Sequence, residues 1–215
     1  MAREERNGKR KLRDQQSKRE PRLGYYGIVT DTRETEKNYF NGLRDSMPKG
    51  LEGKIVIKVT NTDTKNLVRE ANKVVSLHPQ YCEPWIVFDR DQVVDFDKIV
   101  YDAENTGVNV GWSNPCIETW FSAYFGGMPD TCDSTSCCSK FRKTFFKNVG
   151  QDYTKADKAV YLKLTTFGNE EKAVKLAEQR YRTALEKSGY IPSKMSPCST
   201  VFMLIKDIRA RVSGA

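Results

Sequence analysis

Two aspartates, Asp89 and Asp91, stand one residue apart directly after the apolar run 85–88. Such a run predicts a strand that is buried on both faces. Side chains at i and i+2 of an extended chain point to the same side, so both carboxylates can face one point. Two carboxylates at such a short distance repel one another unless a proton or a cation lies between them. Mg²⁺ is a suitable cation because it prefers oxygen ligands. Capping of the following helix is the alternative, because aspartate is a common N-cap, and the pair alone leaves both interpretations open.

A third aspartate, Asp31, follows the first predicted strand, 23–30. In open α/β sheets, ligands bind beyond the carboxyl ends of the strands, where neighbouring connections diverge. If the first and third strands are neighbours, Asp31 meets Asp89 and Asp91 in one crevice. Capping does not require acids from distant loops to converge, whereas a cation site does. Asp31 therefore favours the metal interpretation for all three residues.

Three glutamates lie near the same predicted edge of the sheet. Glu34 and Glu36 fall in the turn that enters the next helix, where the helix dipole favours acids, and Glu36 could also point into the crevice. Glu118 follows the segment Ser113-Asn114-Pro115, which predicts the start of a helix with Ser113 or Asn114 as the cap. A capping-box role and a carboxylate in the crevice both remain open for Glu118.

These acids depend on a chain that alternates strands with helices. Strands are predicted at 23–30, 54–60, 85–88 and 108–112, and helices at 34–46, 64–77, 96–105 and 117–125. Helices of this length between strands indicate parallel pairing through right-handed crossovers. We expect an α/β fold with an open parallel sheet of about four strands and helices on both faces.

The second half of the chain changes character after two glycines at 126 and 127. Further helices are predicted at 140–148, 155–164, 170–187 and 200–212. We therefore expect a basic flexible arm at 1–22, an α/β domain at 23–126 and a helical C-terminal region at 127–215 packed on it. In 140–147 basic residues alternate with phenylalanines, a pattern that could hold a nucleic acid strand. A helix that buries its aromatics and solvates its lysines is the favoured interpretation.

Charge is unevenly distributed along the 215 residues, whose formal net charge is +8. Residues 1–22 hold nine Lys/Arg and four acidic residues and almost no large apolar residue, so this arm cannot order itself by burial. A basic arm suits a polyanionic partner, nucleic acid above all, although a solubilising tail has the same composition. We expect Arg10, Lys11 and Arg13 in the arm, and Arg90 between the two aspartates, to bind nucleic acid.

The apolar runs are too short to span a bilayer and the N-terminus is charged, so we expect neither a membrane helix nor a signal peptide, and a cytoplasmic location. The six cysteines are then expected to stay reduced. Cys132, Cys137 and Cys138 cluster, but without a C-x-x-C pair or a second pair of ligands, and the only histidine, His78, is distant in sequence. A polar loop with incidental thiols is favoured over zinc.

Three segments resemble motifs of RloB-like proteins, in the same order and at similar separations. They are 28–40 (IVTDTRETEKNYF), 87–91 (VFDRD) and 113–120 (SNPCIETW), and the resemblance covers about residues 22–125. It implies a Toprim-like domain, the metal-dependent fold of topoisomerases, primases and some nucleases. It also implies a link to prokaryotic restriction and abortive-infection loci, often beside an ABC-type ATPase partner.

By this resemblance, Asp31 takes the place of a glutamate that serves in acid–base chemistry, and Asp89 and Asp91 match an aspartate pair that binds Mg²⁺. Glu36 and Glu118 match further acids of the family, and we expect them, with Asp31, to be catalytic residues. The usual Glu-Gly is Asp31-Thr32 in this chain. Aspartate withdraws the carboxylate by about 1.5 Å, one C–C bond, and threonine lacks the backbone freedom of glycine. Misplacement by about 1 Å can cost on the order of 100-fold in rate.

The sequence thus predicts a Mg²⁺-dependent nuclease, with Mn²⁺ as a substitute, that hydrolyses DNA or RNA in an anti-phage defence system. Such a site needs neither histidine nor a nucleophilic serine, in keeping with a chain that has one histidine. The alternative is a non-catalytic binding or sensor subunit of an ABC-type ATPase complex. A sugar-nucleotide transferase is disfavoured by the short chain and the basic arm, and a homo-oligomer stays open.

Overall fold

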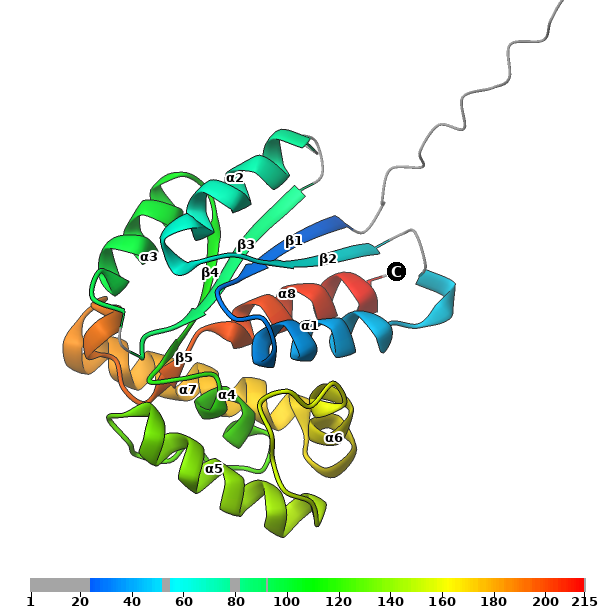
Figure 1. The fold of residues 1–215 in the computed structure, drawn as a ribbon, viewed down its shortest axis with the longest axis vertical. Helices are drawn as coiled ribbons and strands as arrows, with labels where there is room; N and C mark the ends of the chain where they lie inside the picture. Colours follow the sequence, from blue (N-terminus) through cyan, green and yellow to red (C-terminus); the bar gives the residue numbers. More distant parts are fainter. Residues whose placement is uncertain (1–23, 52–54, 78–81, 92, 215) are drawn as a thin grey trace, which may run out of the picture.

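The computed structural model describes residues 24–51, 55–77, 82–91 and 93–214, which fold around a five-stranded sheet of order β2-β1-β3-β4-β5 (Figure 1). The strands are β1 (Gly24–Thr30), β2 (Ile55–Asn61), β3 (Cys82–Asp89), β4 (Asn109–Asn114) and β5 (Cys198–Ser199). Strands β1 to β4 pair in parallel, and β5 is antiparallel to β4. The predicted parallel sheet is confirmed, and β1 and β3 are neighbours as expected.

Helices follow each parallel strand and then make up most of the C-terminal half. They are α1 (Thr35–Asp45), α2 (Leu67–Leu77), α3 (Phe96–Asn105), α4 (Glu118–Ala123), α5 (Ser134–Val149), α6 (Val160–Phe167), α7 (Glu170–Ser188) and α8 (Val201–Ser213). Short 3₁₀ turns are η1 (Lys49–Leu51), η2 (Thr64–Asn66) and η3 (Pro192–Lys194). The predicted helices are all present, with α5 beginning earlier and α6 later than their sequence patterns indicate.

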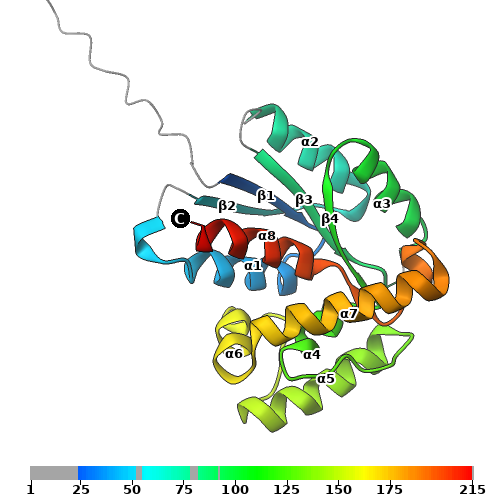
Figure 2. The ribbon, with the colours of Figure 1, turned by 180° about the vertical axis from the view of Figure 1, so that it is seen from behind.

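Both faces of the sheet are buried, as the continuous apolar run in β3 predicts. Trp85 and Val87 of β3 belong to one core cluster, and Ile86 and Phe88 belong to another. Helices α2 and α3 cover the face of the second cluster, and α1 and α8 cover the opposite face (Figures 1 and 2). The period-2 alternation of β3 therefore divides its side chains between two helical layers.

The C-terminal half shares the core of the α/β half. Phe141 and Phe145 of α5 are fully buried in the cluster that holds Trp85, whereas Phe146 is 57% exposed. Packing is thus the role of two of the three phenylalanines that alternate with lysines, as favoured from the sequence. The two-residue strand β5 also extends the sheet, a pairing too short for a sequence pattern to indicate.

The segment expected as a polar loop up to about residue 139 is helical from Ser134 onward. Asp133 caps α5 by accepting a hydrogen bond from the backbone N–H of Ser136 at 2.8 Å, and Cys137 is fully buried. The N-cap and the burial of Cys137 stabilise the start of a helix whose Ser, Thr and Cys residues have only modest helix propensity.

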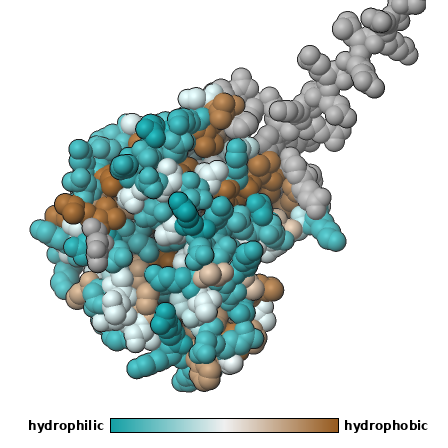
Figure 3. Space-filling view, viewed as in Figure 1, coloured by the Kyte–Doolittle hydropathy of each residue, from teal (hydrophilic) through white to brown (hydrophobic). Residues whose placement is uncertain are grey.

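Hydrophilic side chains dominate the surface in Figure 3, and the apolar side chains there form separate patches. Within the described ranges, no helix is both long enough and apolar enough to cross a membrane.

Candidate functional site

The carboxyl ends of β1, β3 and β4 meet at one edge of the sheet. Thr30 pairs with Val87, and Asp89 pairs with Ser113, so the residues that follow each strand are brought together. In Figure 1 these strands run toward the part of the molecule that contains α4 and α5. The sheet therefore places Asp31 and Asp89 at the same edge, as predicted, because parallel neighbours end on the same side.

Four acidic side chains at this edge interact electrostatically. Burial, with a smaller contribution from the charge of Asp91, raises the pKa of Asp31 to about 6. Burial, followed by the charges of Asp31 and Glu118, raises the pKa of Glu36 to about 8. Burial, followed by the charges of Glu36, Glu118 and Asp31, holds the pKa of Asp89 well above its usual range. We call Asp31, Glu36, Asp89 and Glu118 the carboxylate cluster.

Each member of the carboxylate cluster has one buried oxygen atom that finds no hydrogen-bond partner among the described residues. These atoms are Asp31 Oδ1, Glu36 Oε1, Asp89 Oδ1 and Glu118 Oε2. A buried polar atom without a partner costs about 1–3 kcal/mol, and more when it is charged. A divalent cation removes that cost by coordinating several oxygens and neutralising their charges. The donor set, which is all carboxylate oxygen, fits a hard ion such as Mg²⁺.

Asp91 lies at the rim of the cluster and differs from Asp89 in its surroundings. Strand β3 ends at Asp89, and the chain turns at Asp91, whose φ is +25° and whose side chain is exposed. Its Oδ1 accepts a hydrogen bond from the hydroxyl of Ser134 at 2.8 Å. The expected strand alternation of the two aspartates therefore does not extend to Asp91, although its charge still acts on Asp31.

Threonine hydroxyls hold two members of the carboxylate cluster. The hydroxyl of Thr32 donates a hydrogen bond to Oε2 of Glu36. The hydroxyl of Thr64, at the start of η2, donates to Oδ2 of Asp31 at 3.4 Å. Thr32 stands where the resemblance leads us to expect glycine, so this departure supplies a donor. The role of Thr64 was missed from the sequence because no motif connects η2 with β1.

Glu118 points into the cluster and does not serve in a capping box. Strand β4 continues through Asn114, whose side chain donates hydrogen bonds to the carbonyls of Pro192 and Ser193, so the expected cap at Ser113 or Asn114 is absent. Helix α4 begins only at Glu118, which is fully buried. The extension of β4 explains the error, because it moves the start of the helix past the predicted cap.

Two residues of the segment between α5 and α6 contact Glu118. The hydroxyl of Tyr153 donates a hydrogen bond to Oε1 of Glu118 at 3.0 Å, and Lys155 Nζ lies 4.0 Å from the same oxygen. Sequence reasoning missed both residues, since they lie 35 or more positions beyond Glu118 and outside the motifs. Glu34, by contrast, precedes α1, is exposed and is not among the partners of the carboxylate cluster in the described residues.

Two thiols also lie close to Glu118. Ligand atoms of Cys116, Glu118 and Cys138 lie within 4.8 Å of one another, with 4.0 Å between the two sulfur atoms. Cys132 of the sequence cluster is exposed, and Cys116 from the β4–α4 connection takes its place beside Cys138. Helix α5 thus brings its first turn against α4, a juxtaposition that cysteine spacing could not indicate.

The predicted nucleic-acid contacts divide between described and undescribed residues. Arg10, Lys11 and Arg13 lie outside the described residues. Arg90 lies between the two aspartates, and its backbone N–H donates to the carbonyl of Ser113 at 2.8 Å. Among the described residues its guanidinium has neither a hydrogen bond nor an ion pair. Arg90 is therefore available at the edge of the sheet.

Comparison with known protein families gives a match over most of the chain. The model of a family described as RloB-like protein matches residues 26–208, which extends the three motifs through the C-terminal helices. Neither a curated protein nor a solved structure matches the chain.

Proposed function

This chain belongs to the RloB-like protein family, and we propose that it is a Mg²⁺-dependent nuclease that hydrolyses phosphodiester bonds at the carboxylate cluster. The observation that carries the proposal is the set of four buried carboxylate oxygens that have no hydrogen-bond partner in the part of the chain that the structure describes. Carboxylates with a purely structural role usually accept hydrogen bonds from protein donors or from water. Carboxylates that bind a metal ion have free oxygen atoms when the ion is absent. Mn²⁺, which prefers the same oxygen ligands, is the expected substitute.

The residues at the edge of the sheet divide the work by position. Asp89, at the end of β3, and Asp91, at the rim, would hold the ion, and Glu36 and Glu118 would supply further carboxylate oxygens. A bound Mg²⁺ supplies charge neutralisation at the phosphoryl oxygens and orients water. Asp31 would accept a proton from the attacking water, and a pKa of about 6 suits a group that exchanges protons near neutral pH.

Lys155, which lies beside Glu118, would stabilise the negative charge of the substrate phosphate. Its ammonium group lies 4.0 Å from the Glu118 carboxylate, and its side chain is 55% exposed. A cation in this position reaches both the cluster and solvent, where a phosphate approaches. The negative charge that gathers in phosphoryl transfer favours such a cation. Arg90 and the arm residues Arg10, Lys11 and Arg13 would hold the rest of the nucleic acid.

A second candidate function is a non-catalytic binding or sensor subunit of an ABC-type ATPase complex in anti-phage defence. Asp31-Thr32 in place of Glu-Gly favours it, because the Thr32 hydroxyl engages one oxygen of Glu36. In this alternative the ion holds the fold of the site without hydrolysis. Both candidates share the metal, the cytoplasmic setting and an ATPase partner, and a homo-oligomer is compatible with either.

Cleavage assays separate the two candidates. Purified protein is incubated with plasmid, single-stranded DNA and tRNA, with Mg²⁺ or Mn²⁺, with and without the ATPase. We expect cleavage that falls by more than about 100-fold in Asp89→Asn, a larger loss than changes in outer-shell partners cause. Asp102→Asn, an exposed exchange on α3, is the matched control and should cleave normally. Stable association with the ATPase without cleavage under any condition would favour the subunit.

A further inference from the structure

A cavity of about 600 Å³ opens beside the carboxylate cluster, where α5 begins. Its lining residues are Asp91, Ser134, Thr135, Cys138, Ser139, Arg142, Lys143 and Lys155. Asp91 forms the wall toward the cluster, through its hydrogen bond with Ser134. Lys155 belongs to both places, because it lines the cavity and pairs with Glu118. The cavity therefore adjoins the buried carboxylate cluster through Asp91 and Lys155.

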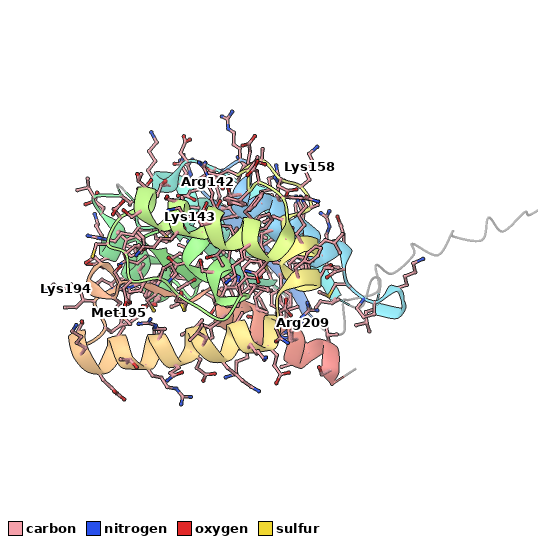
Figure 4. The ribbon with its side chains drawn as sticks, turned by 90° about the horizontal axis from the view of Figure 1, so that it is seen from below. Arg142, Lys143, Lys158, Lys194, Met195 and Arg209 are labelled. Carbon is pink, nitrogen blue, oxygen red and sulfur yellow. The ribbon has the colours of Figure 1, made fainter. Side chains whose placement is uncertain are left out.

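Positive charge dominates this cavity. Arg142, Lys143 and Lys155 contribute three cations against the single carboxylate of Asp91. Figure 4 shows Arg142 and Lys143 on α5, on the side of the molecule that also carries Lys158. Within the described ranges, neither Arg142 nor Lys143 has a hydrogen bond or an ion pair. Two exposed cations without partners, next to a third, indicate an anionic ligand.

The other lining groups suit a phosphate and not a base. The hydroxyls of Thr135 and Ser139 can donate hydrogen bonds to phosphoryl oxygens, whereas that of Ser134 already donates to Asp91, and the first turn of α5 adds the positive end of its dipole. An arginine fork matches the oxygens of a phosphate in a bidentate manner. Among the described residues, the lining contains neither aromatic side chains, on which bases stack, nor amide side chains, which read the edges of bases.

We propose that this cavity binds a backbone phosphate of the nucleic acid strand, next to the phosphate that lies at the carboxylate cluster. The inference rests on the proposed function and deepens it by assigning the path of the strand across the N-terminal half of α5. Phosphate contacts position a nucleic acid without reading its sequence. Recognition at this site is therefore independent of base sequence, and Lys155 lies between the two bound phosphates.

The test measures strand binding without hydrolysis. Fluorescence anisotropy of labelled 20-nucleotide DNA and RNA strands is recorded with the full chain in EDTA at several salt concentrations. We expect Arg142→Gln/Lys143→Gln to bind at least about 10-fold more weakly than the wild type, with the slope of log K against log[salt] smaller by about 1.4. Each lost contact with a single strand removes roughly 0.7 from that slope.

The matched control is Lys147→Gln/Lys172→Gln, which removes the same charge from exposed positions of α5 and α7 outside the cavity. Glutamine keeps helix propensity in both double variants, and circular dichroism melting verifies that they fold. The control should retain nearly wild-type affinity and slope. Equal losses in the two double variants would overturn the inference, because a diffuse charge effect would then account for binding. Similar losses of affinity for the DNA and the RNA strands would support recognition of the backbone. A loss confined to strands of one base composition would contradict it.

The two proposals fail in different ways. If the wild type cleaves and binds nucleic acid but the two double variants bind equally well, the proposed phosphate site is contradicted and the proposed nuclease activity is not. If the protein binds strands through Arg142 and Lys143 but cleaves no substrate with any metal, the proposed nuclease activity is contradicted and the strand-binding site is not. Absence of strand binding by the wild type in both arms contradicts the phosphate site directly.

Discussion

The hydroxyl of Tyr153 donates a hydrogen bond to Oε1 of Glu118 at 3.0 Å and so connects the α5–α6 segment to the carboxylate cluster. Tyr153 is buried, and its ring packs edge-on against Phe141 at a centroid distance of 4.7 Å. The C-terminal helices therefore position a residue of the site as well as cover the sheet. Removal of this hydroxyl should affect the proposed metal site without removing a proposed ligand.

We predict that Tyr153→Phe keeps the packing of the ring but leaves Glu118 with one donor fewer. The free energy of unfolding should fall by about 1.5–3 kcal/mol, the range for a hydrogen bond to a charged group. Mg²⁺ affinity, measured by isothermal titration calorimetry, should fall by about 10–100-fold, as for other outer-shell partners. Tyr101→Phe, which removes a hydroxyl bonded to the Tyr190 carbonyl, should leave Mg²⁺ affinity unchanged. Equal Mg²⁺ affinities in the two variants would contradict the role of Tyr153.

The raised pKa values of Asp31 and Glu36 make the stability of the metal-free protein depend on pH. The folded protein holds these protons more tightly than the unfolded chain, whose carboxyl pKa values are near 3.8 and 4.5. This stabilisation is complete below about pH 4 and is lost as the pH rises through about 6 and then about 8. The melting temperature in EDTA should therefore fall between pH 5 and pH 8.

Glu36→Gln should reduce that fall, because a neutral amide cannot ionise in the buried cluster. A gain of several degrees at pH 8 is expected, since about 1 kcal/mol corresponds to roughly 2–4 °C in a chain of this size. Mg²⁺ should stabilise the wild type more at pH 8 than at pH 5, because more of its proposed carboxylate ligands are ionised at pH 8. Glu186→Gln, at an exposed site on α7, should keep the full dependence on pH. A melting temperature that rises from pH 5 to pH 8 in EDTA would contradict the buried cluster.

The hydrogen bond between Thr32 and Glu36 gives a third prediction. Thr32→Val keeps the shape of the side chain but removes the donor to Glu36 Oε2. We expect Mg²⁺ affinity to fall by about 10-fold, because the carboxylate loses a group that orients it. Thr62→Val makes the same exchange after β2 and should bind Mg²⁺ normally. Higher Mg²⁺ affinity in Thr32→Val would show instead that Thr32 competes with the metal for Glu36.

Helix α6 approaches α1 closely enough to require glycine at position 42. A Cβ atom added to Gly42 would lie 2.6 Å from Cβ of Tyr161. Gly42→Ala should therefore destabilise the fold by about 1–3 kcal/mol, as overpacking does, despite the better helix propensity of alanine. Gly50→Ala, where a Cβ would meet no atom within 4 Å, should unfold at nearly the wild-type urea concentration. Equal urea midpoints for the two variants would show that α1 and α6 can move apart without loss of stability.

Much of the fold could be predicted from the sequence because strand and helix periods are local. The apolar run before Asp89 and the helical spacing after each strand indicate the parallel sheet. Asp31 and Asp89 could be placed together on the further assumption, taken from common strand orders of this fold, that β1 and β3 are neighbours. β5 could not be predicted, because two residues carry no period. The beginning of α5 depends on a cap at Asp133 and on burial of Cys137, and burial is a property of the folded chain.

The candidate site could be predicted where a motif follows a strand, but not where a distant segment reaches it. Glu36 and Glu118 resemble family acids, yet their burial and their partners depend on packing. Tyr153 and Lys155 approach from the segment between α5 and α6, and Thr64 approaches from η2. Asp91 shows the limit of strand alternation, since the chain turns after Asp89. Side chains that converge from separate segments become recognisable only in three dimensions.

The most direct measurement is an anomalous-difference map from crystals of the full chain soaked in Mn²⁺. The account predicts a peak at bonding distance, about 2.0–2.2 Å for a Mg²⁺-like ion, from carboxylate oxygens of the cluster, including Oδ1 of Asp89 and Oε1 of Glu36. The same crystals of Asp89→Asn should show a weak peak or none. A wild-type map without a peak among these oxygens, or with Mn²⁺ only at the exposed rim, would contradict the claim that the carboxylate cluster is a metal site.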